Sequence, residues 1–372
     1  MRIIQNMELR IDFCRVVCYS ENERNVSLSE VKDMKATMKD IAQKTGLGLA
    51  TISKYMNGGH VLEKNRIAIE AAIEELDYTV NEFARGLKTN RSKTVGVVIP
   101  QLNNIFMTSI ITNVEEVLRR HGYGILVTDT GKDEEREEEA IRFLLRKKVD
   151  GLFIIATSKE VKILDVVLKN QIPVVVVDRK IERLEGITDT VLVENFQVAK
   201  KTVQYLIDRG HTKIGLLIGS RETYTSRRRM DGYREAFKEN HIPIQEEWIA
   251  TADFTVQGGY ESTKRLLKEK EPITALFATN YEMTLGALLA LNERGISIPE
   301  QVSLIGFDNP DLAKAMRPKL TLVSQPIEEI GKSAAKLLLE RMELRETGKG
   351  KTIVLNASLE EGASVLKRIN EK

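Results

Sequence analysis

The stretch from Met38 to Asn57 places the strongest constraint on what this chain can fold into. Ile41 gives a first short helical segment its apolar face, and Gly46 is suited to end that segment because glycine accepts a left-handed backbone. A second helical segment, Leu49 to Met56, turns Ile52 towards the same core. Two short helices joined by a glycine turn indicate a helix-turn-helix, whose second helix enters the DNA major groove. An ordinary helical hairpin is the alternative.

A third helical pattern runs from Glu63 to Asp77, with Ile67 and Ile69 among its apolar positions. With the residues that follow, this region resembles the DNA-binding head of the LacI/GalR (lactose-repressor/galactose-repressor) family of bacterial transcription regulators. The resemblance continues to nearly the end of the chain. Its most specific pieces, in the family's order and spacing, are Asp40-Ile-Ala, Ala50-Thr-Ile-Ser-Lys54, Asn57-Gly, Arg66, Glu74-Glu-Leu-Asp-Tyr78 and Asn81-Glu-Phe-Ala-Arg-Gly-Leu87.

The resemblance implies which residues of the head contact DNA. Leu49, Ala50 and Lys54 take the positions that face base edges. The first two would offer apolar contact to thymine methyls, whereas Lys54 can donate to guanine, with less discrimination than the arginine more usual in the family. The other expected contacts, several of them to phosphates, which position without specifying, are Thr37, Met38, Thr51, Ser53, Asn57, Tyr78, Asn81, Ala84, Arg85 and Leu87.

The run from Asn81 to Lys88 resembles the family's hinge helix. Because isolated helices shorter than roughly 12 residues are marginal, this helix should fold only when two copies meet on DNA. Leu87 is then the wedge that enters a minor-groove step and bends the duplex. The alternative is that Leu87 belongs to the core of the following domain.

Composition and charge restrict the remaining classes. The net charge of the chain is only +2. Residues 34–93 carry ten Lys and Arg against seven Asp and Glu, a local +3 that by itself would equally suit a solvated face. The only cysteines, Cys14 and Cys18, are too few for a disulfide framework or a closed zinc site, so a reducing cytoplasm fits. We find no membrane span of roughly 20 apolar residues, no secretion signal, and no motif for a metal or cofactor.

Residues 1–33 match nothing in the family, whose chains usually begin near the position of Met34. They form either a true extension or the product of a misassigned start codon, which we favour. The codons of Glu30-Val31-Lys32-Asp33 can contain GAGGT, a ribosome-binding-type sequence, just before Met34. N-terminal sequencing of the native protein decides between the two.

From Thr94 onwards the pattern changes to continuous Val, Ile and Leu runs that alternate with helical segments. Such runs are typical of strands buried on both faces in parallel βαβ units. Two series of them predict two α/β lobes, each with a parallel sheet and flanking helices, and the family resemblance implies a body like that of periplasmic binding proteins. The expected domains are a helix-turn-helix head (34–80), a hinge and linker (81–93) and an effector-binding and dimerisation body (94–372). We assign 94–193 and 324–343 to the first lobe, and 194–323 and 344–372 to the second. The family resemblance implies that the segment Thr321–Gln325 and the helix Glu328–Arg341 cross back to the first lobe.

Polar residues follow many of these strands, and ligands of open α/β sheets bind beyond the carboxyl ends of strands. Carboxylates, amides and arginines beside an aromatic ring suit a polyhydroxylated ligand. Individually, such an Asp is often a helix cap and such a Phe a core residue; together they favour a cleft between the lobes. The predicted effector-binding residues, several of them carried over from the family, are Gln101, Phe106, Asp178, Arg229, Phe254, Asn280 and Asp308.

The cleft departs from the family pattern at Asn280-Tyr281, Asn104-Ile-Phe-Met107 and Glu194-Asn195, so the shape of the pocket is not that of the best-known members. Arg227 and Arg228, beside Arg229, would favour an anionic effector, or they are simply solvated helix surface. A sugar or sugar derivative is the expected effector.

We therefore expect a cytoplasmic, homodimeric transcription regulator that acts as a repressor on a pseudo-palindromic operator, and not an enzyme. A regulator with a phosphocarrier-protein corepressor, of the catabolite-control type, is the main alternative. A carbohydrate-binding protein without DNA-binding activity is another. A Rossmann-type enzyme is disfavoured because the chain has no Gly-x-Gly-x-x-Gly, P-loop or Gly-x-Ser-x-Gly motif and its four histidines are scattered.

Overall fold

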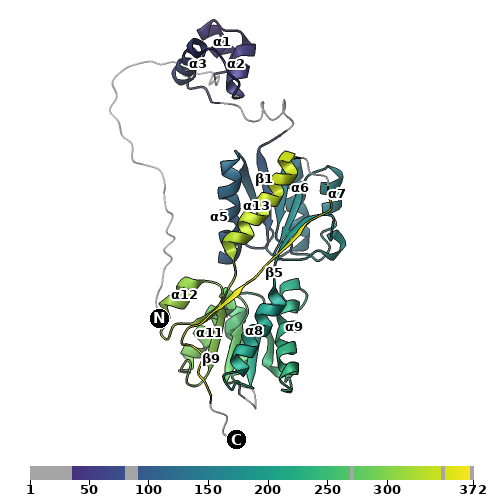
Figure 1. Cartoon of the computed structure of the whole chain (residues 1–372), viewed down its shortest axis with the longest axis vertical. Coiled ribbons are helices and arrows are strands. Elements are labelled where there is room, and N and C mark those ends of the chain that lie inside the picture. Colours follow the sequence, from purple (N-terminus) through teal and green to yellow (C-terminus); the bar gives the residue numbers. More distant parts are fainter. Residues whose placement is uncertain (1–35, 80–90, 269–271, 345–347, 369–372) are drawn as a thin grey trace, which may run out of the picture. The chain divides into compact units, whose positions relative to one another are not determined.

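The computed structural model describes residues 36–79, 91–268, 272–344 and 348–368. They fall into two compact units, a head within residues 1–81 and a body within residues 82–372 (Figure 1). The extension 1–33 and the hinge positions Asn81, Ala84, Arg85 and Leu87 lie outside the described residues. Within the described ranges, no helix is both long and apolar enough to cross a membrane.

The head consists of α1 (Met38–Thr45), α2 (Leu49–Met56) and α3 (Glu63–Glu75). Gly46 ends α1 with φ at 68°, the left-handed conformation expected of it. The core of the head is formed by Ile41, Ile52, Ile69 and Ala72, so the predicted helix-turn-helix is confirmed.

Ile67 departs from the predicted apolar face of the third helix. Ile67 is 56% exposed, whereas Ile69 is fully buried. Ile67 and Ile69 are two positions apart, which places them about 200° apart around a helix with 3.6 residues per turn. They therefore cannot both face one small core.

The first lobe is built on a parallel sheet with strand order β11-β5-β4-β3-β1-β2. Helices α5 (Ile105–Arg120) and α13 (Ile327–Leu344) pack on one face, while α6 (Glu134–Arg146) and α7 (Leu164–Lys169) cover the other (Figure 1). The Val and Ile runs are continuous because both faces of the sheet are covered. The strands and the 3-10 helix of this lobe are β1 (Thr94–Ile99), β2 (Gly124–Asp129), β3 (Gly151–Ile154), β4 (Val174–Val177), η1 (Glu182–Leu184), β5 (Asp189–Val193) and β11 (Thr352–Leu355).

The second lobe repeats this plan with strand order β12-β10-β9-β8-β6-β7, in which only β12 pairs antiparallel. Helix α8 packs against α9, and α10 packs against α11. The elements of this lobe are α8 (Asn195–Ile207), β6 (Ile214–Ile218), α9 (Tyr224–Glu239), η2 (Glu246–Trp248), β7 (Ile249–Thr251), α10 (Val256–Leu266), β8 (Ala275–Ala278), α11 (Tyr281–Glu293), β9 (Ser303–Phe307), α12 (Pro310–Ala315), β10 (Thr321–Ser324) and β12 (Ser358–Glu360).

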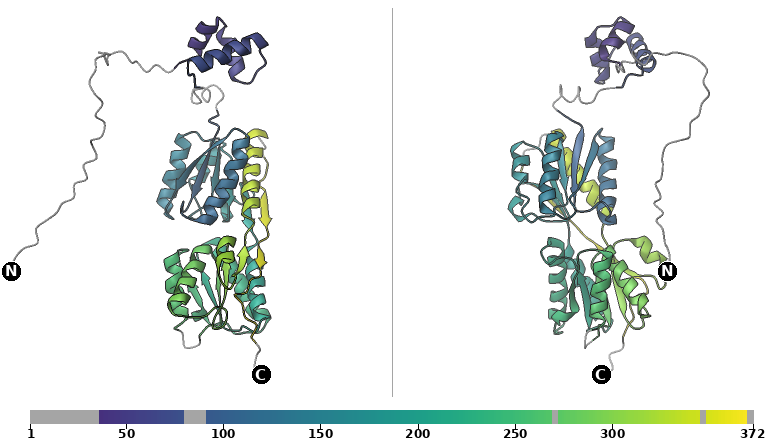
Figure 2. Two further views of the ribbon diagram at one scale, coloured as in Figure 1. Left: turned by 90° about the vertical axis from the view of Figure 1, so that its left-hand side faces the viewer. Right: turned by 180° about the vertical axis from the view of Figure 1, so that it is seen from behind.

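The chain passes between the lobes after β5, after β10 and after β11 (Figure 2). Two expectations are corrected here. Strand β10 stays in the second sheet beside β9 instead of crossing back to the first lobe. Strand β11, which we expected in the second lobe with the rest of 344–372, pairs with β5 in the first sheet. Both segments are apolar runs that either sheet could accept, and their partners are set by tertiary contacts.

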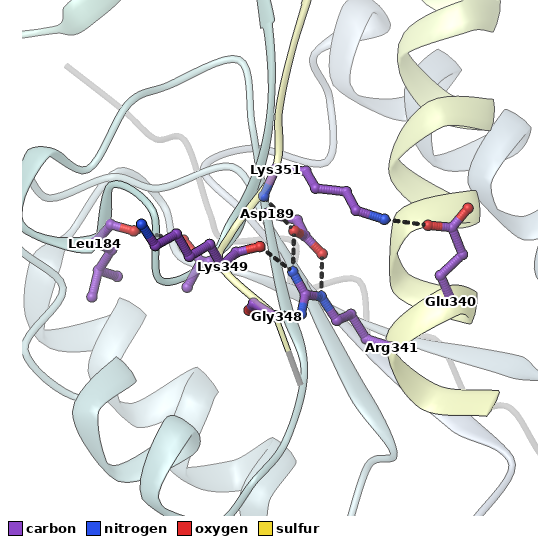
Figure 3. Close-up of polar contacts among 8 residues, drawn as sticks. Leu184, Asp189, Glu340, Arg341, Gly348, Lys349 and Lys351 are labelled. Atoms are coloured by element: carbon purple, nitrogen blue, oxygen red, sulfur yellow. Dashed lines mark hydrogen bonds and ion pairs between the residues drawn. The ribbon is translucent and has the colours of Figure 1, made fainter. Parts of the chain in front are cut away.

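A buried ion pair attaches β11 and helix α13 to β5 (Figure 3). Arg341 Nε and Nη2 donate to the two carboxylate oxygens of Asp189 at 2.9 and 2.8 Å, and the backbone N–H of Lys351 donates to the same carboxylate at 2.8 Å. Arg341 also donates to the carbonyls of Gly348 and Lys349, both at 2.9 Å. One arginine thus links the last helix, the segment after it and the sheet.

Candidate functional site

The head exposes the residues that the sequence assigns to base contacts. Leu49 is 47% exposed at the first turn of α2, and Ala50 and Lys54 are exposed on the same short helix. Ile52 is fully buried, so α2 has one face in the core and another available to a groove. Gly48 caps α2 without a side-chain hydrogen bond.

The residues predicted at the edges of the DNA contact have local structural roles as well. The Oγ1 and backbone N–H of Thr37 both donate to the Asp40 carboxylate at 2.7 Å, which caps the start of α1 beside Met38. Asn57 Nδ2 donates to the Ser53 carbonyl at 2.6 Å at the end of α2. Tyr78 packs against the head core, and Thr51 and Ser53 are half-buried. Contact with phosphates therefore stays a prediction for these residues.

In the body, all seven predicted effector-binding residues line one small cavity of about 60 Å³. Gln101 and Phe106 come from the segment after β1 and the start of α5, and Asp178 follows β4 in the first lobe. The others come from the second lobe, where Arg229 lies on α9 and the remaining three follow strands: Phe254 after β7, Asn280 after β8 and Asp308 after β9. The cavity therefore lies between the carboxyl ends of both sheets.

Arg229 is buried on the wall of this cavity. Its Nε donates to Asn195 Oδ1 at 2.7 Å, its Nη1 donates to the Thr279 carbonyl, and its guanidinium lies 4.0 Å from the centre of the Phe307 ring. Burial lowers the pKa of Arg229, while the nearby Asp178 carboxylate opposes that shift. The guanidinium is held rigidly, as a ligand-binding group requires.

Asp308 is a strongly perturbed carboxyl group of the cavity. Burial raises its pKa to about 7, partly offset by Arg229 and by the hydrogen bond that Gln325 Nε2 donates to Oδ2 at 2.9 Å. Its Oδ1 and the Oε1 of Gln325 are buried and have no hydrogen-bond partner among the described residues. Such orphaned acceptors are costly in a folded protein and mark a place for a donor.

Phe254 and Asn280 occupy constrained positions in the cavity wall. Phe254 has φ at 60°, and its ring covers Gly219 so closely that a Cβ there would lie 1.9 Å from a ring carbon. Asn280 Oδ1 accepts from the Met283 N–H at 2.9 Å and so caps α11, while its Nδ2 donates to Glu282 at 2.6 Å. Asn280 is therefore a helix cap as well as a wall of the cavity.

The sequence did not single out Lys132, Glu282 or Gln325, which also line the cavity. Glu282 Oε1 accepts from Asn104 Nδ2 of the first lobe at 2.8 Å, and Lys132 Nζ donates to the Asp253 carbonyl of the second lobe at 2.7 Å. Gln325 directly follows β10, so the strand-end rule would have found it had β10 been assigned to the second sheet.

Arg227 and Arg228 are not among the residues that line the cavity. Arg227 donates to the Glu222 carbonyl at 3.1 Å, and Arg228 lies 3.6 Å from Asp231 and over the ring of Phe196. Both are helix-surface residues, which removes the main argument for an anionic effector. Within the described part of the chain, no cluster of His, Cys, Asp or Glu is arranged to hold a metal ion.

Comparison with known proteins agrees with the two units of the structure. Residues 37–81 match the model of bacterial regulatory proteins of the lacI family, and residues 203–365 match a periplasmic binding protein-like domain. Relatives covering most of the chain are transcriptional repressors. This protein belongs to the LacI family of DNA-binding transcription regulators, and it has the helix-turn-helix head and two-lobed body of that family.

Two relatives illustrate the degree of similarity. The HTH-type transcriptional repressor PurR of Klebsiella pneumoniae (strain 342) is 33% identical over 82% of this chain and 90% of its own length. Catabolite control protein A of Priestia megaterium is 32% identical over 83% of this chain and 93% of its own length.

Two solved structures are similar over nearly the whole described chain. The lac repressor dimer bound to operator and the anti-inducer ONPF gives a TM-score of 0.80 at 25% identity, covering 89% of this chain and 99% of that one. The complex of the transcriptional regulator CelR with cellobiose gives a TM-score of 0.66 at 28% identity, covering 88% of this chain and 99% of that one.

Proposed function

We propose that this protein represses transcription as a homodimer on a pseudo-palindromic operator, and that a sugar or sugar derivative in the cleft between the lobes controls its affinity for DNA. The convergence of seven predicted residues from both lobes on one cavity carries the proposal for the effector. Two buried acceptors in that cavity, Asp308 Oδ1 and Gln325 Oε1, need donors, and sugar hydroxyls supply them. The solved relative bound to cellobiose supports a carbohydrate ligand.

The proposal for DNA rests on the head. Leu49, Ala50 and Lys54 lie exposed on α2, with Lys54 as the residue that discriminates guanine. Leu87, outside the described residues, would enter the minor groove once two hinges pair. Closure of the lobes on the effector changes the spacing of the paired hinges, so the affinities for effector and operator are reciprocally linked.

Two measurements test this function together. A thermal-shift screen of sugars identifies the effector, since a ligand at 100 times its dissociation constant stabilises the folded state by about 2.7 kcal/mol. Gel shifts on promoter fragments from the protein's own genome, with and without that sugar, then measure the linkage. A purely monomeric protein, or one that binds no such fragment, would contradict the proposal.

Control by a phosphocarrier protein is the second candidate, favoured by the similarity to catabolite control protein A. The stretches Gly306-Phe-Asp-Asn309 and Arg317-Pro-Lys-Leu-Thr321 also resemble that protein. A pull-down with the phosphorylated phosphocarrier protein, matched to the unphosphorylated form, distinguishes the two. If only the phosphorylated form is retained, and if it also strengthens operator binding, then the phosphocarrier protein and not a sugar is the main effector.

A further inference from the structure

The cleft between the lobes has two compartments. The inner chamber is the cavity of about 60 Å³ that contains Asp178, Asp308 and Gln325. A second and larger hollow of about 830 Å³ lies between the start of α6 with residues 157–163 of the first lobe and residues 220–223 of the second. We refer to this hollow as the vestibule. Lys132, Arg179 and Phe254 line both compartments and form the partition between them.

The partition is held by contacts between the lobes. Lys132 Nζ donates to the Asp253 carbonyl at 2.7 Å, and the next residue is Phe254, with its ring against Gly219. Lys159 and Glu222 form an ion pair across the mouth of the vestibule. A ligand that occupies both compartments therefore lies beside the Phe254 ring.

The inner chamber has spare acceptors, and each of its cations makes at least one hydrogen bond to the protein. Arg229 donates to the Asn195 side chain and the Thr279 carbonyl, Arg179 to the Ala156 carbonyl, and Lys132 to the Asp253 carbonyl. The buried side-chain atoms of the chamber without partners among the described residues are two acceptors, Asp308 Oδ1 and Gln325 Oε1, and one donor, Arg179 Nε. Hydroxyl groups can satisfy all three because they both donate and accept, whereas a phosphate, which only accepts, would leave the two acceptors unpaired.

The vestibule is acidic and large. Seven acidic side chains line it against four basic ones, so a phosphorylated ligand would meet net negative charge there. At about 60 Å³ the inner chamber is smaller than common ligand pockets of roughly 300–1,000 Å³. The vestibule, at about 830 Å³, falls within that range. The polar groups that need a ligand lie in one compartment, and most of the space lies in the other.

We propose that the effector is an uncharged carbohydrate of two or more linked units, with its terminal unit in the inner chamber and the next unit in the vestibule. The inference rests on the proposed function of the same cleft. The terminal unit donates hydroxyls to Asp308 and Gln325, while the linkage passes the Phe254 ring, whose apolar face suits the C–H side of a sugar.

Calorimetric titration of the full chain with matched sugars tests the proposal. The probes are glucose, cellobiose, maltose and glucose 6-phosphate, and galactose, lactose and galactose 6-phosphate. We expect one disaccharide to bind at least tenfold more tightly than its monosaccharide, and both sugar phosphates to bind more weakly than either. If a monosaccharide binds as tightly as its disaccharides, or if a sugar phosphate binds most tightly, the two-unit inference is wrong but the proposed function still stands. Absence of binding by every sugar overturns the proposed function and the inference with it.

A substitution in the vestibule gives a second test. Glu134→Trp, at the exposed first turn of α6, places a large ring in the vestibule without removing a hydrogen bond or ion pair of the described structure. The matched control, Glu139→Trp, is exposed on the same helix outside the vestibule. We expect Glu134→Trp to weaken disaccharide binding about tenfold and to leave monosaccharide binding unchanged, and the control to alter neither. Equal weakening of both sugars, or of neither, contradicts the two-unit model.

Discussion

Replacing Arg341 with alanine should destabilise the first lobe more than any other single charge deletion on α13. The substitution leaves the carboxylate of Asp189, whose side chain is 1% exposed, with only the backbone N–H of Lys351 as a donor. Breaking a buried pair by removing one partner costs roughly 3–5 kcal/mol. Because the Arg341 side chain is itself 12% exposed, water can partly replace it, and we expect about 3 kcal/mol.

The matched control on the same helix is Lys332→Ala. Lys332 pairs with Glu328 four residues earlier, but both side chains are more than half exposed, so the expected cost is at most about 1 kcal/mol. Urea unfolding of both variants is followed by far-UV circular dichroism and by the fluorescence of Trp248, the single tryptophan, which is buried in the second lobe.

In Arg341→Ala, we expect the part of the circular dichroism signal that comes from the first lobe to be lost at a lower urea concentration than in the wild type. This loss should precede the change in Trp248 fluorescence, which reports on the second lobe. The variant Asp189→Asn combined with Arg341→Ala should recover part of the lost stability, because the uncompensated charge is gone. If Arg341→Ala costs no more than Lys332→Ala, the ion pair does not stabilise the lobe and the reasoning is refuted.

Four further predictions concern stability and binding. His211 is buried among Thr274, Ser303 and Leu366, and burial lowers its pKa to about 4. Its contribution to the free energy of unfolding is therefore complete above pH 6.5 and falls by about 3 kcal/mol as the pH is lowered towards 4. The raised pKa of Asp308 changes stability with pH in the opposite direction, so the effect of His211 is measured as the difference between the urea midpoints of wild type and His211→Gln from pH 7 to 4. If the two proteins show parallel plots of urea midpoint against pH, the prediction for His211 is wrong. Asp308→Asn should stabilise the protein by roughly 2 kcal/mol at pH 8, because the raised pKa makes the buried carboxylate unfavourable above pH 7, yet weaken effector binding in calorimetry. Lys54→Ala should weaken operator binding by about 1–3 kcal/mol, with relaxed preference at one base pair in gel shifts. Leu87→Ala should leave the thermal midpoint and effector binding unchanged while operator affinity falls; equal operator affinity would reject the wedge role.

Part of the fold follows from local patterns in the chain. Gly46 between two short amphipathic segments predicted two helices joined by a tight turn, since a left-handed residue at that point stops α1 and turns the chain. The family resemblance then favoured a helix-turn-helix over an ordinary helical hairpin. Gln101, Asp178, Asn280 and Asp308 were singled out because strand ends in parallel sheets meet at one edge. Arg229, on α9, came from the family resemblance alone. Ile67 was wrongly predicted to lie on the buried face of α3, because the apolar character of a residue does not show whether its side of the helix faces the small core.

The sequence by itself determined the elements of this protein, their order and the residue types at the strand ends, because these depend on periodicity and on neighbouring residues. Only the tertiary structure decided which sheet takes β10 and β11, because an apolar run carries no record of the strand it will pair with. It also decided that Gln325, Lys132 and Glu282 join the cleft, since they meet the other residues only after the chain has passed between the lobes. The division of the cleft at Phe254 depends on packing across two lobes, which no local pattern records.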